Sequence, residues 1–307
     1  MIKKLKKIIY NPELLLSWTI NKGILKWIKD ETCLKIKYKA ALNKKLNLDN
    51  PQTFNEKLQW LKLYDINPEY TKMVDKYEVK KYVADIIGKE YIIPTLGIWD
   101  KFENINFEKL PNQFVLKCTH DSGGLVICKD KSKFNIKEAK KKIMGSLKKD
   151  YFYLGREWPY KNVKPRIIAE KYMATYKQKE LIDYKFFCFN GEPKFLYVSE
   201  GLSNHENARI SFANMDYEKT EFYRKDYSPF DKLPNKPTNF DKMKELSKKL
   251  SKNIPFIRVD FYEVNGQVYF GELTFFPCSG LIPFEPEEWD KKLGDMLELP
   301  KEKKIEK

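Results

Sequence analysis

Hydrophobic positions along this chain switch between helical and strand spacing, which predicts a protein built from both kinds of element. Apolar residues recur at helical spacing within residues 1–48, with lysines on the opposing faces. Thr53 and Glu56 have the spacing of a capping box, which predicts a helix that continues through Tyr64. Further helices are predicted over residues 71–87, 136–147 and 239–252, and strands over 91–99, 114–118, 125–128, 167–173, 181–189 and 195–199.

Residues 256–274 carry the strongest pattern, two apolar and aromatic runs joined at an Asn265-Gly266 turn signal. Two registers are open to this hairpin. A two-residue turn pairs Val264 with Gln267, whereas a three-residue loop, with Gly266 free to take positive φ, pairs Val264 with Val268. We predict the three-residue loop, because that register sorts polar and apolar side chains onto separate faces.

In this register Asp260 lies opposite Glu272 and Arg258 lies opposite Thr274, all on one face. Two converging carboxylates beside an arginine are costly to bury unless they share a cation. We therefore predict a Mg²⁺ ion that carries a polyphosphate, with the salt-bridged polar face of an ordinary sheet as the alternative. The other face forms a predicted core stripe of Ile257, Val259, Phe261, Tyr269, Leu273 and Phe275.

A short predicted strand over residues 114–118 carries Lys117 and leads into the loop Thr-His-Asp-Ser-Gly-Gly of residues 119–124. A second strand follows, so the loop is not a Walker P-loop, in which a helix must follow. Backbone N–H groups of such a loop can close over phosphates while the lysine neutralises their charge. A plain hairpin turn is the alternative, because the Ser-Gly-Gly sequence alone is a weak signal.

Composition places the chain among globular proteins with a large core, since 42% of its 307 residues are hydrophobic and 15% are aromatic. The net charge of +15 is uneven, because residues 1–48 hold twelve lysines against three acidic residues. No basic region interleaves arginine and aromatic residues as nucleic-acid modules do, so no nucleic acid partner is expected. Residues 1–48 are then either a solvated helical pair that caps the fold or a basic amphipathic surface for a membrane or lipid-linked substrate.

Cysteine and histidine usage narrows the chemistry further. The five cysteines show no CxxC spacing, which is typical of reduced thiols in a cytoplasm. With two histidines, neither a zinc site nor a facial-triad iron site is expected. No apolar run approaches the ~18–20 residues of a membrane span, and the apolar stretch at the start is broken too early for a secretory signal.

Several of these pieces occur in an order and spacing that resemble the ATP-grasp ligases, the superfamily of D-alanine–D-alanine ligase. The resemblance covers roughly residues 45–290, and the residues before 45 match much less well. Four motifs are similar to the TupA-like branch, whose members are typically found in cell-surface polysaccharide synthesis. They are Asn-Pro-x-Thr-Phe-Asn-Glu-Lys-Leu-x-Trp60, Val-Asp-Lys-Tyr77, Leu-Pro-Asn-x-Phe-Val-Leu-Lys117 and Asp-Tyr-Lys-Phe-Phe-Cys-Phe-Asn-Gly191.

The resemblance implies an α+β protein with the ATP-grasp fold, in which two sheet-bearing lobes clasp ATP, preceded by a basic helical N-terminal extension. The implied division has four parts. They are the extension (1–48), a pre-ATP-grasp region (49–110), a small subdomain with the phosphate loop (111–178) and a C-terminal subdomain with the metal-binding hairpin (179–300).

The resemblance also implies two sets of nucleotide-binding residues. The phosphates would be held by Lys76, Lys117, Ser122, Gly123 and Gly124. The adenine would meet backbone groups of the strand at Glu170, Lys171 and Met173, and the ribose would meet the carboxylate of Asp183.

The implied metal ligands are Asp260, Glu272 and Thr274, which would hold Mg²⁺. Arg258 would steady the transferring phosphoryl group, and Lys185, which shares a strand face with Asp183, is the second implied catalytic residue. Thr274 departs from the superfamily pattern, since most members have asparagine there. Asp121 is a second departure, because a carboxylate within the phosphate loop argues against a direct phosphate contact by that side chain.

The implied activity is that of an ATP-dependent, ADP-forming carboxylate–amine ligase that needs ATP and Mg²⁺. It would form an amide on a sugar acid or amino acid, free or glycan-linked, in cell-surface polysaccharide or capsule biosynthesis. The acceptor pocket would draw on residues 200–230 and 276–284. The enzyme would be cytoplasmic, or peripheral at the inner face of the membrane through residues 1–48. Two alternatives are a kinase or other phosphotransferase acting on a glycan precursor, and a non-catalytic nucleotide-binding partner of a glycosyltransferase.

Overall fold

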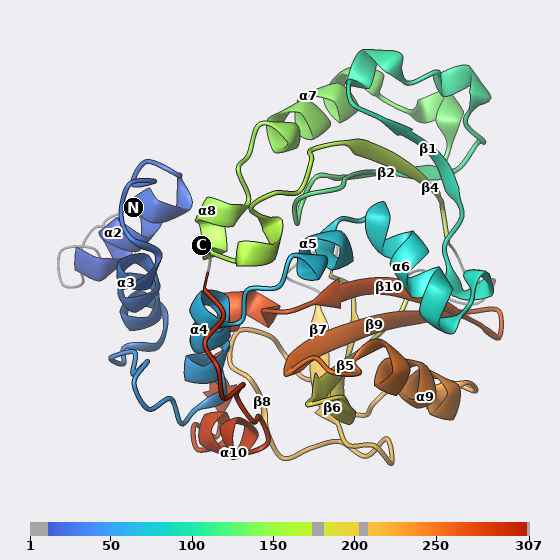
Figure 1. Ribbon diagram of the computed structural model, residues 1–307. Helices are drawn as coiled ribbons and strands as arrows, with labels where there is room; N and C mark the ends of the chain where they lie inside the picture. Colours follow the sequence, from blue (N-terminus) through green and yellow to red (C-terminus); the bar gives the residue numbers. More distant parts are fainter. Residues whose placement is uncertain (1–11, 174–180, 203–207, 306–307) are drawn as a thin grey trace.

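The computed structural model describes residues 12–173, 181–202 and 208–305. Two antiparallel β-sheets form two lobes that face each other, and helices lie against the outer side of each (Figure 1). The fold is therefore of the α+β class, as the resemblance implies. Both sheets are built from segments that the hydrophobic pattern assigns to strands, with short strands added after residue 208.

The smaller lobe is a four-stranded sheet whose outer face is covered by α7 (Ile136–Leu147), which buries Ala139 and Ile143 (Figure 1). Its strands, in spatial order, are β1 (Thr95–Trp99), β4 (Ile167–Lys171), β2 (Phe114–Cys118) and β3 (Leu125–Cys128). β1 pairs with β4 within this sheet. The small lobe thus includes a strand that the expected division places in the preceding region, 49–110.

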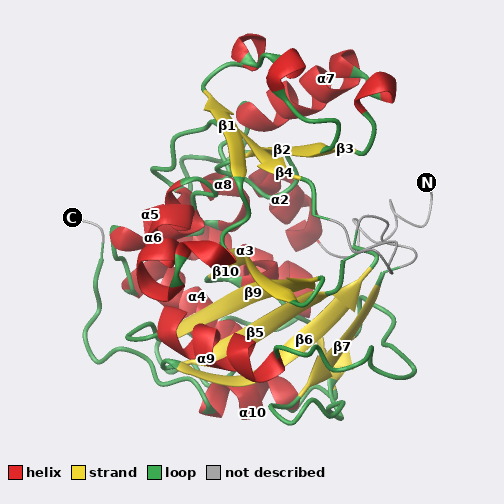
Figure 2. Cartoon of the chain, turned by 90° about the vertical axis from the view of Figure 1, so that its right-hand side faces the viewer, coloured by secondary structure: helices red, strands yellow, loops and turns green. Residues whose placement is uncertain are grey.

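The larger lobe is a five-stranded sheet (Figure 2), and its central strand β5 is buried on both faces. Neighbouring residues of β5 show this, since Phe186 contacts Phe240 of α9 (Phe240–Leu250) while Phe187 contacts Phe54 of α4 (Phe54–Tyr64). Burial on both faces explains the near-continuous apolar run of this strand. The strands, in spatial order, are β10 (Gln267–Thr274), β9 (Phe256–Val264), β5 (Asp183–Phe189), β6 (Glu192–Glu200) and β7 (Arg209–Ala213).

Helix α4 begins at the predicted capping box. Thr53 Oγ1 accepts a hydrogen bond from the Glu56 amide at 3.2 Å, and Glu56 Oε2 accepts one from the Thr53 amide at 3.0 Å. Both partners lie within four residues of each other, so the signal is local. This is why the sequence alone could predict it.

The helix predicted over residues 71–87 is instead two helices, α5 (Glu69–Val74) and α6 (Glu78–Ile87). Asp75 causes the break, because its Oδ1 accepts from the amides of Tyr77 (2.8 Å) and Glu78 (3.2 Å) and so begins a new helix. Lys76 lies in the break, and its amide donates to the carbonyl of Thr119 at 3.1 Å. The break therefore places Lys76 beside the loop 119–124.

A helical pair, α2 (Pro12–Asn21) and α3 (Asp30–Leu42), lies at one side of the molecule (Figure 1). α3 buries Leu34 and Tyr38 in the same core cluster as the larger lobe. α3 is thus built into the core, which favours the capping interpretation for this helix. None of the helices in the described ranges has both the length and the apolar content that crossing a membrane requires.

Short elements complete the described chain. The segment 151–165 contains α8 (Phe152–Gly155) and a 3₁₀ turn, η5 (Trp158–Tyr160). β8 (Tyr223–Arg224) pairs with β11 (Phe284–Glu285) in a separate two-stranded sheet. The others are α10 (Trp289–Asp295) and five further 3₁₀ turns, η1 (Lys89–Tyr91), η2 (Phe102–Asn104), η3 (Phe107–Lys109), η4 (Lys131–Lys133) and η6 (Pro277–Gly280).

Candidate active site

The turn of the β9–β10 hairpin has two residues, not the three that we predicted. Asn265 and Gly266 both take positive φ, at 52° and 80°, as a type I′ turn requires. Val264 therefore pairs with Gln267. If this register continued along the strands, the two carboxylates of the hairpin would lie on opposite faces.

A β-bulge at Gly271 restores the predicted pairing of the polar residues. The register shifts between Phe270 and Glu272, which adds one residue to β10. Beyond the shift, Glu272 pairs with Asp260 and Thr274 pairs with Arg258. The predicted juxtaposition is thus confirmed, while the predicted loop is wrong.

The core stripe of the hairpin differs from the prediction at one position. Phe270 is buried opposite Phe261, whereas Tyr269 is half-buried opposite Tyr262. The difference follows from the bulge, because residues before it keep the register of the two-residue turn. The other predicted members of the stripe are buried, namely Ile257, Val259, Phe261, Leu273 and Phe275.

Arg258 is the centre of the polar face of the hairpin. Its Nε and Nη2 donate to the two oxygens of Asp260, each at 2.7 Å. Nη2 also donates to Glu272 Oε1 at 2.9 Å and to Thr274 Oγ1 at 3.0 Å. One buried guanidinium therefore fixes the positions of all three side chains that were predicted to bind the metal.

Lys185 on β5 adds a second buried cation. Its Nζ lies 2.7 Å from Asp260 Oδ2 and 2.9 Å from Asp183 Oδ1. Protein cations thus neutralise the buried carboxylate of Asp260, so the polar face is salt-bridged as the alternative described. Lys185 therefore links Asp183, the predicted ribose ligand, to Asp260, a predicted metal ligand.

Glu272 is the accessible carboxylate of this face, with 47% of its side chain exposed. Desolvation within the site raises its pKa, but the positive charges of Arg258, Lys185 and Lys76 outweigh that effect and hold the pKa at about 2. The carboxylate is therefore ionised at neutral pH and open to a ligand.

The donor set fits a Mg²⁺ ion that is shared with phosphate oxygens. Within the described ranges, no three histidine, cysteine or acidic side chains gather closely enough to hold a metal. Mg²⁺ in proteins often takes one or two carboxylates and completes its shell with phosphate and water. Glu272 could supply such a ligand, with Asp260 opposite it and the hydroxyl of Thr274 3.3 Å from its Oε1.

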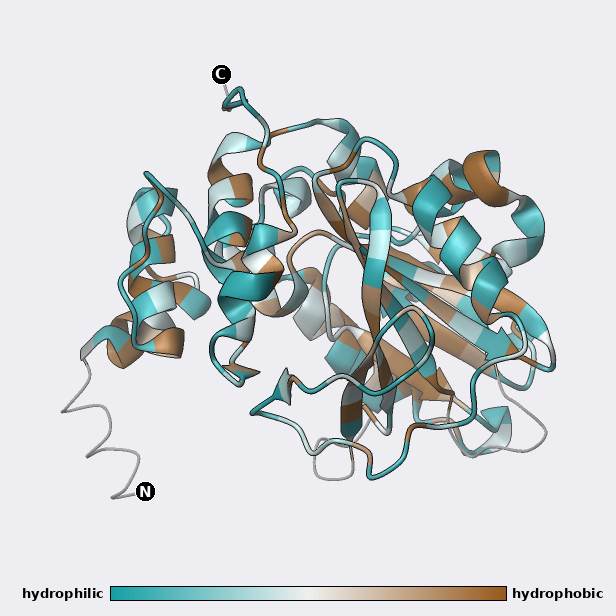
Figure 3. Ribbon diagram, turned by 90° about the horizontal axis from the view of Figure 1, so that it is seen from below, coloured by the Kyte–Doolittle hydropathy of each residue, from teal (hydrophilic) through white to brown (hydrophobic). Residues whose placement is uncertain are grey.

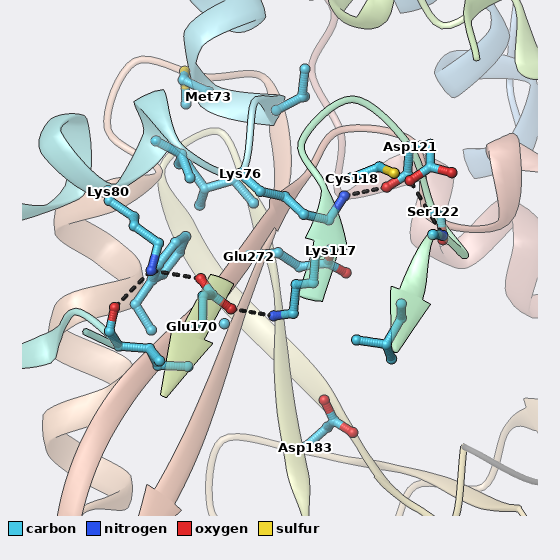
Figure 4. A pocket seen from close by; sticks show the side chains of 18 of the residues that line it. Met73, Lys76, Lys80, Lys117, Cys118, Asp121, Ser122, Glu170, Asp183 and Glu272 are labelled. Atoms are coloured by element: carbon cyan, nitrogen blue, oxygen red, sulfur yellow. Dashed lines mark hydrogen bonds and ion pairs between the residues drawn. The ribbon is translucent and has the colours of Figure 1, made fainter. Parts of the chain in front are cut away.

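A cleft of about 390 Å³ is lined by residues of both sheets and of α5 and α6 (Figure 4). Its apolar lining includes Met73, Val74, Val79, Ile92, Ile93, Phe270 and Leu273. Its charged lining consists of four lysines, Lys76, Lys80, Lys117 and Lys185, and four acidic residues, Asp121, Glu170, Asp183 and Glu272. The cleft lining thus combines apolar side chains with equal numbers of positively and negatively charged ones.

Glu170 joins two lysines within this cleft (Figure 4). Its Oε1 lies 2.6 Å from Lys80 Nζ, and its Oε2 lies 2.6 Å from Lys117 Nζ. Burial raises the pKa of this carboxyl, but the ammonium charges of Lys117 and Lys80 outweigh it and lower the pKa to about 2. Lys80 was not predicted, and no local signal marks it, because its partner Glu170 lies ninety positions away in the sequence.

The loop 119–124 is anchored at its base by Asp121. This residue is buried, its Oδ1 accepts from the Gly124 amide at 3.3 Å, and its Oδ2 accepts from Ser146 Oγ on α7. Lys76 Nζ donates to the carbonyl of the same residue. Residues 122–123 form the exposed tip. The carboxylate thus turns inward, as its expected lack of phosphate contact requires, and the tip is left to meet a ligand.

The predicted site residues divide into four groups. Asp260 is buried, and Arg258 and Thr274 line a second cavity. Lys171 and Met173 line neither cavity; the Lys171 side chain is exposed and its amide donates to the Pro94 carbonyl at 3.0 Å. Their contact with adenine stays a prediction. The cleft itself is lined by Lys76, Lys117, Ser122, Gly123, Gly124, Glu170, Asp183, Lys185 and Glu272.

The second cavity, of about 320 Å³, adjoins the cleft through three shared residues, Ser122, Tyr160 and Glu272. Residues 276–279 fall within a range expected to form the acceptor pocket, whereas residues 151–160 were not expected there. Of the other expected range, 200–230, Leu202 lines the first cleft. The rest of the lining is Tyr151, Leu154, Gly155, Glu157, Arg258, Thr274, Phe276, Cys278 and Ser279.

Lys62 on α4 holds two walls of the second cavity together. Its buried Nζ donates to the carbonyls of Gly155 and Ser279, each at 2.9 Å, and to Ser279 Oγ at 2.8 Å. A further wall is aromatic, because the rings of Tyr151 and Tyr160 meet edge to face with centroids 4.7 Å apart. None of these residues carries a local sequence signal, since their contacts join segments far apart in the chain.

Two antiparallel sheets around a lysine-lined cleft, with a hairpin that carries two facing carboxylates, define the ATP-grasp class of protein. The family described as TupA-like ATPgrasp matches residues 56–298, and the chain belongs to this TupA-like ATP-grasp family. The matched span contains every residue that lines the two cavities. The resemblance inferred from the sequence is therefore confirmed. No curated protein matches the chain in sequence.

Solved structures of ATP-grasp ligases are similar to the chain at low identity. D-Alanine–D-alanine ligase from Helicobacter pylori is 17% identical, with 80% of this chain and 69% of that one covered and a TM-score of 0.39. The same ligase from Bacillus anthracis complexed with ATP is 16% identical, with 79% and 65% covered and a TM-score of 0.38. ATP-grasp ligase PsnB with its minimal precursor, Mg and ADP is 9% identical, with 78% and 63% covered and a TM-score of 0.40.

Proposed function

We propose that this chain is an ATP-dependent, ADP-forming ligase that joins a carboxylate to an amine through an acyl phosphate. The observation that carries the proposal is the junction of the two cavities, which share Ser122 of the loop 119–124, Tyr160 and Glu272. A nucleotide in the cleft would direct its terminal phosphate to this junction. A second substrate in the adjoining cavity would meet the phosphate there.

The cleft suits ATP in its size and in the division of its lining. Its volume of about 390 Å³ is that of a small-molecule site. The apolar side chains of Val79, Ile93 and Phe270 would receive the base, while Lys76 and Lys117 would neutralise the phosphates. A Mg²⁺ ion bound at the hairpin would add charge neutralisation at those phosphates.

The proposed reaction needs no protein nucleophile. A carboxylate oxygen of the substrate attacks the terminal phosphorus of ATP, and the bond from that phosphorus to ADP breaks to leave an acyl phosphate. The amine nitrogen then attacks the acyl carbon, phosphate leaves, and the nitrogen loses a proton to give the amide. The protein contributes by positioning and by charge, which Arg258, held by its acidic neighbours, supplies at the wall of the second cavity.

We further propose that the carboxylate belongs to a sugar acid or amino acid of a cell-surface polysaccharide, assembled in the cytoplasm at the inner face of the membrane. The resemblance to a branch typical of polysaccharide synthesis supports this substrate class. The second cavity also suits a polar ring, because the aromatic rings of Tyr151 and Tyr160 line it together with the charged and hydroxyl groups of Arg258, Glu157 and Thr274.

An ADP-release screen tests the proposal. The full chain is given ATP, Mg²⁺ and pairs drawn from a panel of uronic acids, amino acids and amines, and products are identified by mass spectrometry. We expect ADP and an amide that require both substrates. A phosphorylated sugar formed without an amine would identify a phosphotransferase instead. Nucleotide binding without turnover across the panel would favour a non-catalytic partner, and release of AMP would contradict the proposed chemistry.

A further inference from the structure

The helical pair α2–α3 has an outer surface that the proposed catalysis does not use. On α2 and the turn after it, five large apolar side chains are exposed within residues 15–27, including Trp18 at 54% and Trp27 at 80%. Single exposed apolar residues are normal, whereas five within thirteen residues single out this segment as a candidate interaction surface. Figure 3 shows hydrophobic residues on this pair, to one side of the main body. We name it the docking surface: Leu15, Leu16, Trp18, Ile24 and Trp27.

The inner face of the same pair is fully packed, so the docking surface is not a misplaced piece of core. Ile20 of α2 and Cys33, Leu34 and Tyr38 of α3 are all buried. The two faces of the pair therefore differ in kind. One face closes the fold, and the other presents tryptophan and aliphatic side chains to the solvent.

The charge around the docking surface decides which occupant suits it. Lys22 and Lys29 are exposed in the turn, and Lys22 Nζ lies 5.7 Å from the ring centroid of Trp18. The described residues 12–48 hold eight lysines against three acidic residues, a net charge of +5. Two copies of such a surface would repel each other. An anionic bilayer would instead accept the indole rings at its interface and attract the lysines.

We propose that the docking surface binds an anionic lipid bilayer. A consequence, which rests on the proposed function, is that the acceptor substrate is anchored in that bilayer. The pair also supports the second cavity: Arg156 Nη1 lies 2.8 Å from Asp30 Oδ1, Arg156 Nη2 donates to the Leu25 carbonyl at 3.1 Å, and Lys37 Nζ donates to the Leu154 carbonyl. Membrane binding would therefore hold a wall of the acceptor cavity close to the lipid surface.

Vesicle sedimentation with the full chain tests this proposal. Vesicles of mixed phosphatidylglycerol and phosphatidylcholine are compared with vesicles of phosphatidylcholine alone, at low and high salt. We expect binding to the anionic vesicles at low salt and its loss at high salt. The double variant Trp18→Ala, Trp27→Ala should lower the partition coefficient by roughly tenfold or more. The matched control Ile136→Ala, which alters an exposed apolar residue of α7, should bind like the unmodified protein.

Substitution is preferred to deletion of residues 1–45, because deletion would also remove the buried Leu34 and Tyr38. Thermal melting followed by circular dichroism establishes that the variants are folded. If the double variant fails to fold, quenching of the unmodified protein's tryptophan fluorescence by brominated lipid replaces it. Quenching is expected, and its absence overturns the proposal.

Three other results would overturn the proposal: no binding at low salt, binding that is indifferent to salt, or equal binding by the double variant. Self-association that the double variant loses would identify a second copy of the chain as the occupant, and would also overturn it. The measurement needs neither ATP nor substrate. Failure of the proposed ligase activity would therefore leave the vesicle result intact, and the two proposals can fail separately.

Discussion

Asp260 and Glu272 face each other across β9 and β10, yet they meet different surroundings. Both oxygens of Asp260 accept from Arg258, and Lys185 adds a third contact beneath the surface. Glu272 gives one oxygen to the same arginine and keeps nearly half of its side chain exposed. The buried carboxylate therefore holds the cations in place, and the outer carboxylate is available to a ligand.

This division predicts that Asp260→Asn and Glu272→Gln both reduce ATP turnover, by about a hundredfold or more, because each weakens charge compensation at the phosphates. They should differ in stability. Asp260→Asn leaves two buried cations without their shared anion, so the free energy of unfolding should fall by about 3 kcal/mol. Glu272→Gln should change it by less than about 1 kcal/mol. Urea unfolding and ADP release measure both quantities, and near-normal turnover in either variant would refute the metal assignment.

Lys76→Met and Lys117→Met should each weaken ATP binding by roughly tenfold or more, because each removes a cation from the cleft. The matched control is Lys141→Met, which alters an exposed lysine of α7 and should leave affinity unchanged. Isothermal titration calorimetry with a non-hydrolysable ATP analogue gives the affinities. Equal losses in all three variants would mean that the positive charge acts diffusely over the lobe.

Mg²⁺ should bind this protein tightly only when a nucleotide is present. Glu272 is the accessible carboxylate at the hairpin, and a single carboxylate holds Mg²⁺ weakly unless phosphate oxygens complete its shell. Calorimetric titration should therefore detect no Mg²⁺ binding up to about 1 mM without nucleotide, and clear binding once ADP is added. Chelation of the metal should stop turnover. Tight binding to the nucleotide-free protein would show that the hairpin alone forms a complete metal site.

Glu170 should make the free energy of unfolding depend on pH. Its folded-state pKa of about 2 lies below the ordinary value of 4.5, so its contribution is fully present above that ordinary value and is lost as the pH falls toward 2. Glu170→Gln should lower the free energy of unfolding near neutral pH by about 3 kcal/mol. The difference between the two proteins should shrink on acidification, which denaturant titrations across that range would reveal. A difference independent of pH would mean that the carboxylate is not preferentially ionised in the fold.

The sequence predicts the parts of this molecule whose signals are local. The capping box of Thr53 and Glu56 and the helices α7 and α9 follow from short-range spacing. The facing carboxylates were predicted from the wrong cause, because Gly271 was not used as a bulge signal although a glycine within a strand is one. A Cβ at Gly271 would lie 3.0 Å from Tyr262 Cε2 and 3.2 Å from the Asp260 carbonyl, so the site suits a glycine.

Lys80 and the tyrosine wall of the second cavity could not be found in this way. Lys80 pairs with Glu170, ninety positions away in the sequence, and Tyr151 and Tyr160 share the second cavity with residues of the β9–β10 hairpin. Lysine side chains are usually solvated and tyrosine side chains are usually packed against their neighbours. The spacing of Lys80, Tyr151 and Tyr160 along the sequence matches no motif that would mark them as functional. Only the paired sheets and the docked helices give them a shared cavity.

The balanced charge of the cleft has a consequence for what can enter it. Its four lysines are matched by four acidic residues, and Glu170 occupies two of those lysines at once. A small anion such as orthophosphate would have to compete with that carboxylate and brings no cation that could engage Glu272. A triphosphate accompanied by a divalent metal brings both signs, so it can engage the lysines and Glu272 together. We therefore expect simple anions to bind this cleft more weakly than a metal-bound triphosphate, because Glu170 and Asp183 already pair with three of its four lysines.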